Sequence, residues 1–89
     1  MDFTDIYHSI NRLPFIDSQK TCSIIQKLQQ RLIENRIDLN TVFEFCKRVS
    51  KEIKQQNISD KAVDVEKSRQ LLVELIKKEI EKFLQLIGE

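Results

Sequence analysis

The chain has 89 residues, of which 40% are hydrophobic and 33% are charged, and its net charge is +1. This composition is too hydrophobic for a disordered chain, and the single glycine and single proline argue against a β-rich fold, which needs many tight turns. The balanced charge lacks the overall basic excess that favours a nucleic-acid partner.

We predict a first, short helix over residues 3–13. Asp2 can cap its start, and Asp5 adds negative charge to its first turn. Pro14 ends the helix, because proline disfavours helical geometry in the residue before it. Apolar residues spaced by three and four positions form one stripe along this helix: Phe3, Ile6, Tyr7, Ile10 and Leu13.

A second helix is predicted over residues 18–35, with Asp17 or Ser18 as its N-cap. The opposite face of this helix carries mainly glutamine, lysine, arginine and glutamate, which is typical of a solvated helix face. Its apolar stripe is predicted to consist of Cys22, Ile25, Leu28 and Leu32, widened by Ile24 and Ile33.

Two alternative starts are possible for the third helix. Asp38 can serve as the N-cap, with Ile37 and Val42 as the two members of a hydrophobic staple. Alternatively, Thr41 begins the helix, and Glu44 three residues later completes a capping box. Either start leads into a helix that ends in the segment QQNISD.

The third helix contains two phenylalanines and a cysteine close together. Phe45 lies on one edge of the apolar stripe and Phe43 on the other edge. Cys46 falls in register with the stripe, as Cys22 does in the second helix, which indicates two small core residues and not nucleophiles. The stripe itself consists of Leu39, Val42, Cys46, Val49 and Ile53.

The last helix is predicted to be the longest, from a cap at Ser59 or Asp60 to Ile87, with Gly88 just past its end. Residues 66–70 are wholly polar, so the helix either breaks there or projects in part from a bundle of shorter helices. A projecting apolar end usually meets a partner protein or a second copy of the chain.

Together these elements predict one all-α domain over residues 1–89. Its fold is an antiparallel bundle of four helices, with a short first helix and a long last helix. The predicted core consists of Phe3, Ile6, Ile10, Leu13, Cys22, Ile25, Leu28, Leu32, Val42, Cys46, Val49, Ile53, Leu72, Ile76, Ile80 and Phe83.

The pattern predicts no enzyme, and no catalytic, metal, cofactor or small-molecule site. The only histidine, His8, lies on the polar face of the first helix, and nothing in the sequence brings it to Cys46 as a nucleophile–base pair. No glutamate has a histidine three residues later, which is the pattern of metal-binding helical bundles. The single glycine excludes the glycine-rich loops that bind phosphates.

The sequence also predicts a cytoplasmic location. The longest apolar run, residues 71–73, is far shorter than a membrane span. Asp2 and Asp5 stand where a signal peptide carries positive charge followed by an apolar region.

Three stretches within residues 5–80 carry a family resemblance: DIYHSI, IIQKLQQRLIENRIDLN and the amphipathic helix that follows them. With the order of one short and three long helices, the chain resembles the immunity proteins of pediocin-like bacteriocins. The resemblance implies a cytosolic four-helix bundle that protects its producer by recognising a toxin-bound membrane receptor. The chain departs from the pattern at Gly88 and Glu89, where those proteins carry a further polar tail linked to specificity.

The favoured function is non-enzymatic binding of a protein, as regulator, adaptor or inhibitor, with a partner protein or a second copy of the chain in a homodimer. Apolar candidates for the binding surface are Phe43, Phe45, Phe83, Leu84, Leu86 and Ile87. Residues 18–56 hold eight basic and four acidic residues, and the candidate basic face consists of Arg31, Lys47, Arg48, Lys51 and Lys54. The alternatives are a bacteriocin immunity protein and a nucleic-acid-binding regulator that uses this basic face.

Overall fold

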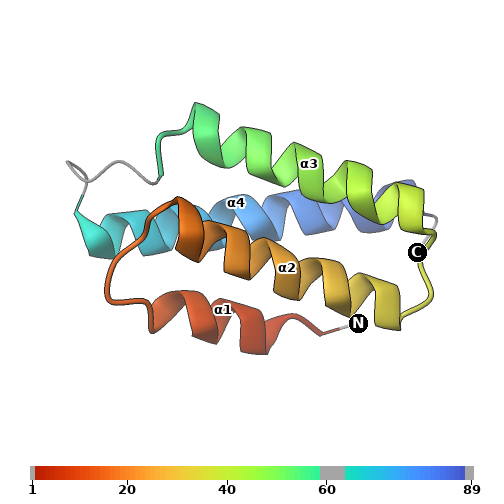
Figure 1. The fold of residues 1–89 in the computed structure, drawn as a ribbon, viewed down its shortest axis with the longest axis horizontal. Helices are drawn as coiled ribbons and strands as arrows, with labels where there is room; N and C mark the ends of the chain where they lie inside the picture. Colours follow the sequence, from red (N-terminus) through yellow and green to blue (C-terminus); the bar gives the residue numbers. More distant parts are fainter. Residues whose placement is uncertain (1, 59–63, 88–89) are drawn as a thin grey trace.

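The structure, a computed structural model, describes residues 2–58 and 64–87. These residues form four α-helices and no strand: α1 (Thr4–Asn11), α2 (Ser18–Glu34), α3 (Leu39–Gln55) and α4 (Val65–Leu86). Successive helices run antiparallel, and they form a ring in which α1 and α3 each pack against both α2 and α4 (Figure 1). The predicted all-α antiparallel bundle, with a short first and a long last helix, is confirmed.

Aspartate side chains cap the starts of α2 and α3. The Asp17 carboxylate accepts a hydrogen bond from the backbone N–H of Lys20 at 2.8 Å, and Asp38 accepts one from the backbone N–H of Thr41 at 3.2 Å. Of the two alternative starts of α3, the one at Asp38 is therefore confirmed. Thr41 lies inside the first turn, where its hydroxyl also donates to Asp38 at 3.3 Å.

The first helix is shorter than the predicted range of residues 3–13. The Asp2 carboxylate accepts a hydrogen bond from the backbone N–H of Thr4 at 3.0 Å, so it satisfies a free donor at the helix start. At the other end the helix stops at Asn11, and Leu13 is already in the connection, because the residue before Pro14 is disfavoured in helical geometry.

Helices α2 and α3 are each followed, two residues after their last residue, by a residue of positive φ: Arg36 at 62° and Asn57 at 53°. After α3, the N–H of Ile58 bonds to the carbonyl of Ile53 at 3.4 Å, and the N–H of Asn57 bonds to Lys54 at 3.2 Å. This pattern is a Schellman motif, and equivalent bonds follow α2. The motif reverses the chain so that Ile58, which was not predicted as a core residue, is fully buried.

The polar stretch 66–70 does not break α4. Ser68 is buried and Arg69 is half-buried, because this part of the helix packs near the connection between α1 and α2. The guanidinium of Arg69 donates through Nε to the carbonyl of Leu13 at 2.8 Å, and Nη2 donates to the same oxygen. The helix is continuous through its 22 residues, about 33 Å at 1.5 Å per residue.

The predicted caps Ser59 and Asp60 and the predicted stop at Gly88 lie outside the described residues. Helix α4 begins at Val65, where the preceding Asp64 makes no side-chain capping hydrogen bond.

The core is close to the predicted set, with one clear correction in α2. Cys22 is exposed, so its prediction as a core residue is wrong, and Thr21 and Ile24 are buried in its place beside Leu28. Burial of Thr21 is compatible with an apolar interface because its hydroxyl donates to the Ser18 carbonyl at 2.9 Å. The buried apolar residues beyond the predicted set are Ile16, Ile24, Phe45, Ile58 and Leu75, while Leu13 and Ile25 are only half-buried.

Candidate functional site: a groove between helices α3 and α4

The two phenylalanines of α3 have different environments. Phe45 is buried against Phe83 of α4, with ring centroids 4.7 Å apart and an angle of 47° between the ring planes. This pair joins the first half of α3 to the last turns of α4, in a tilted geometry that aromatic rings favour. Phe43 points to the other edge of α3 and is 49% exposed.

A groove of about 220 Å³ lies between the first half of α3 and the end of α4. It brings together four of the six predicted apolar candidates, and Leu86 stands at its side with 72% of its surface exposed. Phe43 and Leu84 do not line it. The lining consists of Thr41, Glu44, Phe45 and Arg48 from α3 and of Phe83, Leu86 and Ile87 from the end of α4.

Four of the five predicted basic candidates lie together on the exposed face of α3: Lys47, Arg48, Lys51 and Lys54. In residues 2–58 and 64–87, none of the four lies within 4.0 Å of a carboxylate oxygen. Glu44 and Glu52 lie on the same helix, so its charged residues sum to four positive and two negative. One of these cations, Arg48, also lines the groove, which therefore has an apolar floor and a partly basic side.

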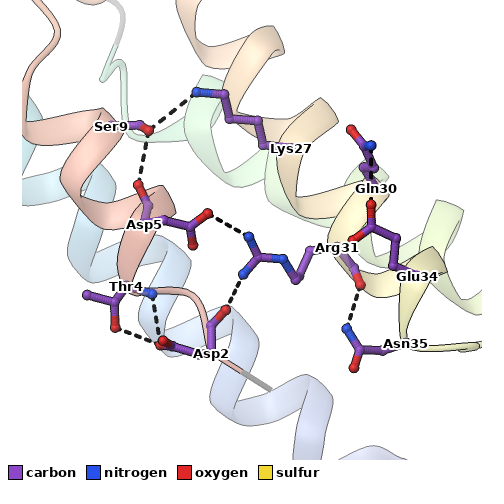
Figure 2. Close-up of polar contacts among 9 residues, drawn as sticks. All are labelled: Asp2, Thr4, Asp5, Ser9, Lys27, Gln30, Arg31, Glu34 and Asn35. Atoms are coloured by element: carbon purple, nitrogen blue, oxygen red, sulfur yellow. Dashed lines mark hydrogen bonds and ion pairs between the residues drawn. The ribbon is translucent and has the colours of Figure 1, made fainter.

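The fifth basic candidate, Arg31, is separated from the others and is bound within the protein. It lies on α2, and its guanidinium contacts the Asp5 carboxylate of α1 at 2.6 Å and the backbone carbonyl of Asp2 (Figure 2). The hydrogen bond from Arg31 holds the pKa of Asp5 below its ordinary value. Arg31 therefore fastens α1 to α2, and we assign it a structural role.

The surroundings of Arg31 form a second, more polar depression of about 290 Å³ between α1 and α2. Lys27 donates to the hydroxyl of Ser9 at 3.3 Å, and Asn35 donates to the backbone carbonyl of Arg31 at 2.8 Å (Figure 2). The Asp2 carboxylate also accepts from the Thr4 hydroxyl at 2.6 Å, which lowers its pKa together with the bond from the Thr4 amide. These groups are already paired with one another, so this depression is the weaker candidate for a binding site.

A buried carboxylate lies one helical turn before the groove. Glu79 of α4 is only 6% exposed, and its Oε2 atom has no hydrogen-bond partner in the part of the chain that the structure describes. Its Oε1 atom is 3.9 Å from Nζ of Lys82, which is itself mostly exposed. Sequence reasoning missed this residue, although its spacing of four from both Leu75 and Phe83 places it on the buried face.

The two cysteines differ in accessibility. Burial raises the pKa of the Cys46 thiol from 9.0 to about 11, as expected for a core residue, whereas Cys22 is exposed on α2. His8 is exposed on α1, and α1 and α3 do not pack against each other in the described structure. Cys46 and His8 are therefore not brought together as a nucleophile and its base.

No group of three or more histidine, cysteine, aspartate or glutamate side chains within residues 2–58 and 64–87 could hold a metal ion. Over the same ranges, no helix is both long enough and apolar enough to cross a membrane.

Comparison of the chain with protein-family models, curated proteins and solved structures finds no match. The resemblance to immunity proteins of pediocin-like bacteriocins therefore rests on helical patterning alone.

Proposed function

We propose that this chain is a non-enzymatic protein-binding module, which acts as a regulator, adaptor or inhibitor by binding a partner protein at the α3–α4 groove. The observation that carries the proposal is the combination of an apolar groove with Leu86, a large apolar side chain that is 72% exposed at its edge. Single exposed apolar residues are common on protein surfaces, whereas one beside an aromatic-floored groove is typical of an interaction site.

The size of the groove supports a protein partner over a small ligand. Its volume of about 220 Å³ is below the range of about 300–1,000 Å³ in which small-molecule sites usually fall. A groove of this size suits one or two anchoring side chains of a partner, and buried aromatic residues such as Phe45 and Phe83 commonly line pockets for such anchors.

Glu79 gives independent support for a functional role of this region. A buried carboxylate with an unpartnered oxygen is unfavourable for stability. Natural proteins tend to retain such unfavourable buried groups at functional sites. Glu79 lies one turn from Phe83, which forms part of the groove, so the buried carboxylate and the groove lie at the same end of the bundle.

The groove also separates the protein-binding proposal from the nucleic-acid alternative. A nucleic acid would use the basic face of α3 through its phosphates and would gain little from an apolar groove. We therefore favour a protein partner.

Affinity capture with matched variants tests this function. The protein and its Leu86→Asp variant would be used to capture partners from extracts of the native host, followed by mass spectrometry. The control is Phe15→Asp, because Phe15 is 49% exposed in the connection between α1 and α2, away from the groove. The proposal requires a protein that the wild type and Phe15→Asp capture and Leu86→Asp loses, with circular dichroism showing that all three are folded. Equal capture by all three variants would contradict a role for the groove.

A further inference from the structure

The exposed face of α3 continues the groove as a row of positive charges. Arg48 lies in the groove lining, and Lys51 and Lys54 follow it along the same helix. At 1.5 Å per residue, these two lysines lie about 4.5 Å and about 9 Å beyond Arg48 along the helix axis. Along α3, the apolar groove therefore comes first, and the row of cations continues from it.

These cations lack acidic partners within the described structure. Within residues 2–58 and 64–87, none of the exposed basic residues of α3 is within 4.0 Å of a carboxylate oxygen, in contrast to Arg31, which is paired with Asp5. A second copy of the chain is a poor occupant for this face, because two α3 helices with two net positive charges each would repel when packed together. The charge calls for an acidic occupant.

The spacing of the cations favours a helical occupant. Carboxylates three or four residues apart on a helix lie about 5–6 Å from one another, close to the separation of successive cations on α3. A helix can also present an apolar side chain and acidic side chains on one face, and docking into a groove between two helices is a common mode of peptide recognition.

We propose that the occupant of the α3–α4 groove is an acidic amphipathic helix of a partner protein. The partner helix places one large apolar side chain beside Phe83 and Leu86. Its carboxylates, one and two helical turns further along the partner helix, lie against Arg48 and Lys51. This inference rests on the proposed protein-binding function and adds the chemistry of the partner. The recognition motif is thus an apolar anchor with acidic residues three to eight positions away, all on one helix face.

Peptide display can test this motif without knowledge of the natural partner. The protein would be biotinylated at Cys22, which is exposed near the start of α2, a helix that does not line the groove. Random displayed peptides of about 16 residues, enough for about four helical turns, would be selected against it at about 50 mM salt. We expect enriched peptides to be acidic and to carry an apolar residue at the predicted spacing from their carboxylates. Enrichment of neutral or basic peptides, or no enrichment, would overturn the inference.

Variants then show whether the enriched peptide uses the proposed surface. Lys51→Glu is expected to weaken binding of the labelled peptide at least about tenfold by fluorescence anisotropy. Lys67→Glu makes the same charge change at an exposed position on α4 and is the control, expected to change binding less than about twofold. Equal effects of the two substitutions would overturn the inference, as would tighter binding of a duplex DNA of about 20 base pairs than of the peptide.

The results also distinguish this inference from the proposed function. Peptides that bind the wild type and fail to bind Leu86→Asp, yet are insensitive to Lys51→Glu, would retain the groove as a protein-binding site and refute the acidic partner. Failure of the proposed function itself is recognised in the capture experiment, where Leu86→Asp and Phe15→Asp would behave alike.

Discussion

Replacement of Glu79 by methionine is expected to stabilise the protein. The substitution removes a carboxylate whose Oε2 atom is buried and has no hydrogen-bond donor among the described residues. Methionine has a similar length and adapts to irregular space between packed side chains. The apolar neighbours Leu75, Ile76 and Phe83 provide the surroundings that such a side chain prefers.

The expected gain follows from two opposing contributions. A buried polar group without a partner costs about 1–3 kcal/mol, and a charged group costs more. Lys82, at 3.9 Å and largely exposed, offsets only about 0.3–0.5 kcal/mol of this cost. The free energy of unfolding is therefore expected to rise by about 1–2 kcal/mol in Glu79→Met, which for a domain of this size corresponds to about 5–15 °C in Tm.

Urea unfolding followed by far-UV circular dichroism measures this gain. The midpoint should rise with an unchanged slope, which indicates a change in stability and not in the unfolded state. Glu74→Met is the matched control on the exposed face of α4, and its effect should stay within about 0.5 kcal/mol. A loss of stability in Glu79→Met with little change in Glu74→Met would refute the reasoning, since it would mean that the Glu79 carboxylate is stabilised by a partner.

Three other measurements test the core, the cysteines and the contact between α1 and α2. Leu28→Ala should lower the free energy of unfolding by about 2–5 kcal/mol in the same urea assay, because Leu28 is fully buried. Iodoacetamide at about pH 8 should modify Cys22 alone in the folded protein, measured by mass spectrometry, since a pKa of about 11 leaves Cys46 about one-thousandth thiolate. The hydrogen bond from Arg31 lowers the pKa of Asp5, so the ion pair stabilises the fold above pH 3.8, and this stabilisation is lost as the pH falls through the lowered pKa. Arg31→Gln should return the pKa of Asp5 towards 3.8, which an NMR titration measures.

The order and antiparallel packing of the helices could be predicted because local signals in the sequence are strong. Asp17 and Asp38 cap helices where their position predicts it, and the apolar residues of α3 keep strict helical spacing. The face of α2 was harder to predict, because Leu28 fits two stripes that differ by about one residue. Only contacts with both α1 and α3 decide that Ile24 is buried and Cys22 is exposed.

The candidate site could be predicted only in part. Leu86 and Phe83 were selected because the apolar end of α4 is wider than one stripe, and both line the groove. Sequence alone did not separate Phe43 from Phe45, since both flank the stripe of α3 at similar angles. It also placed Arg31 with the basic residues of α3, because charge counts along a chain do not show that a guanidinium is paired with a carboxylate on another helix.

The position of Glu79 links the stability of the bundle to its proposed function. If a methionine at this position stabilises the fold, the native glutamate lowers stability beside the groove, and a requirement other than folding would have to account for it. A partner that changes the packing between α3 and α4 could supply the donor that Oε2 lacks in the described part of the chain, because these helices meet at Phe45 and Phe83, one turn away. Stabilised Glu79→Met should then bind the selected acidic peptide more weakly than Glu74→Met does in the anisotropy assay. Equal affinities would show that the buried carboxylate has no part in recognition.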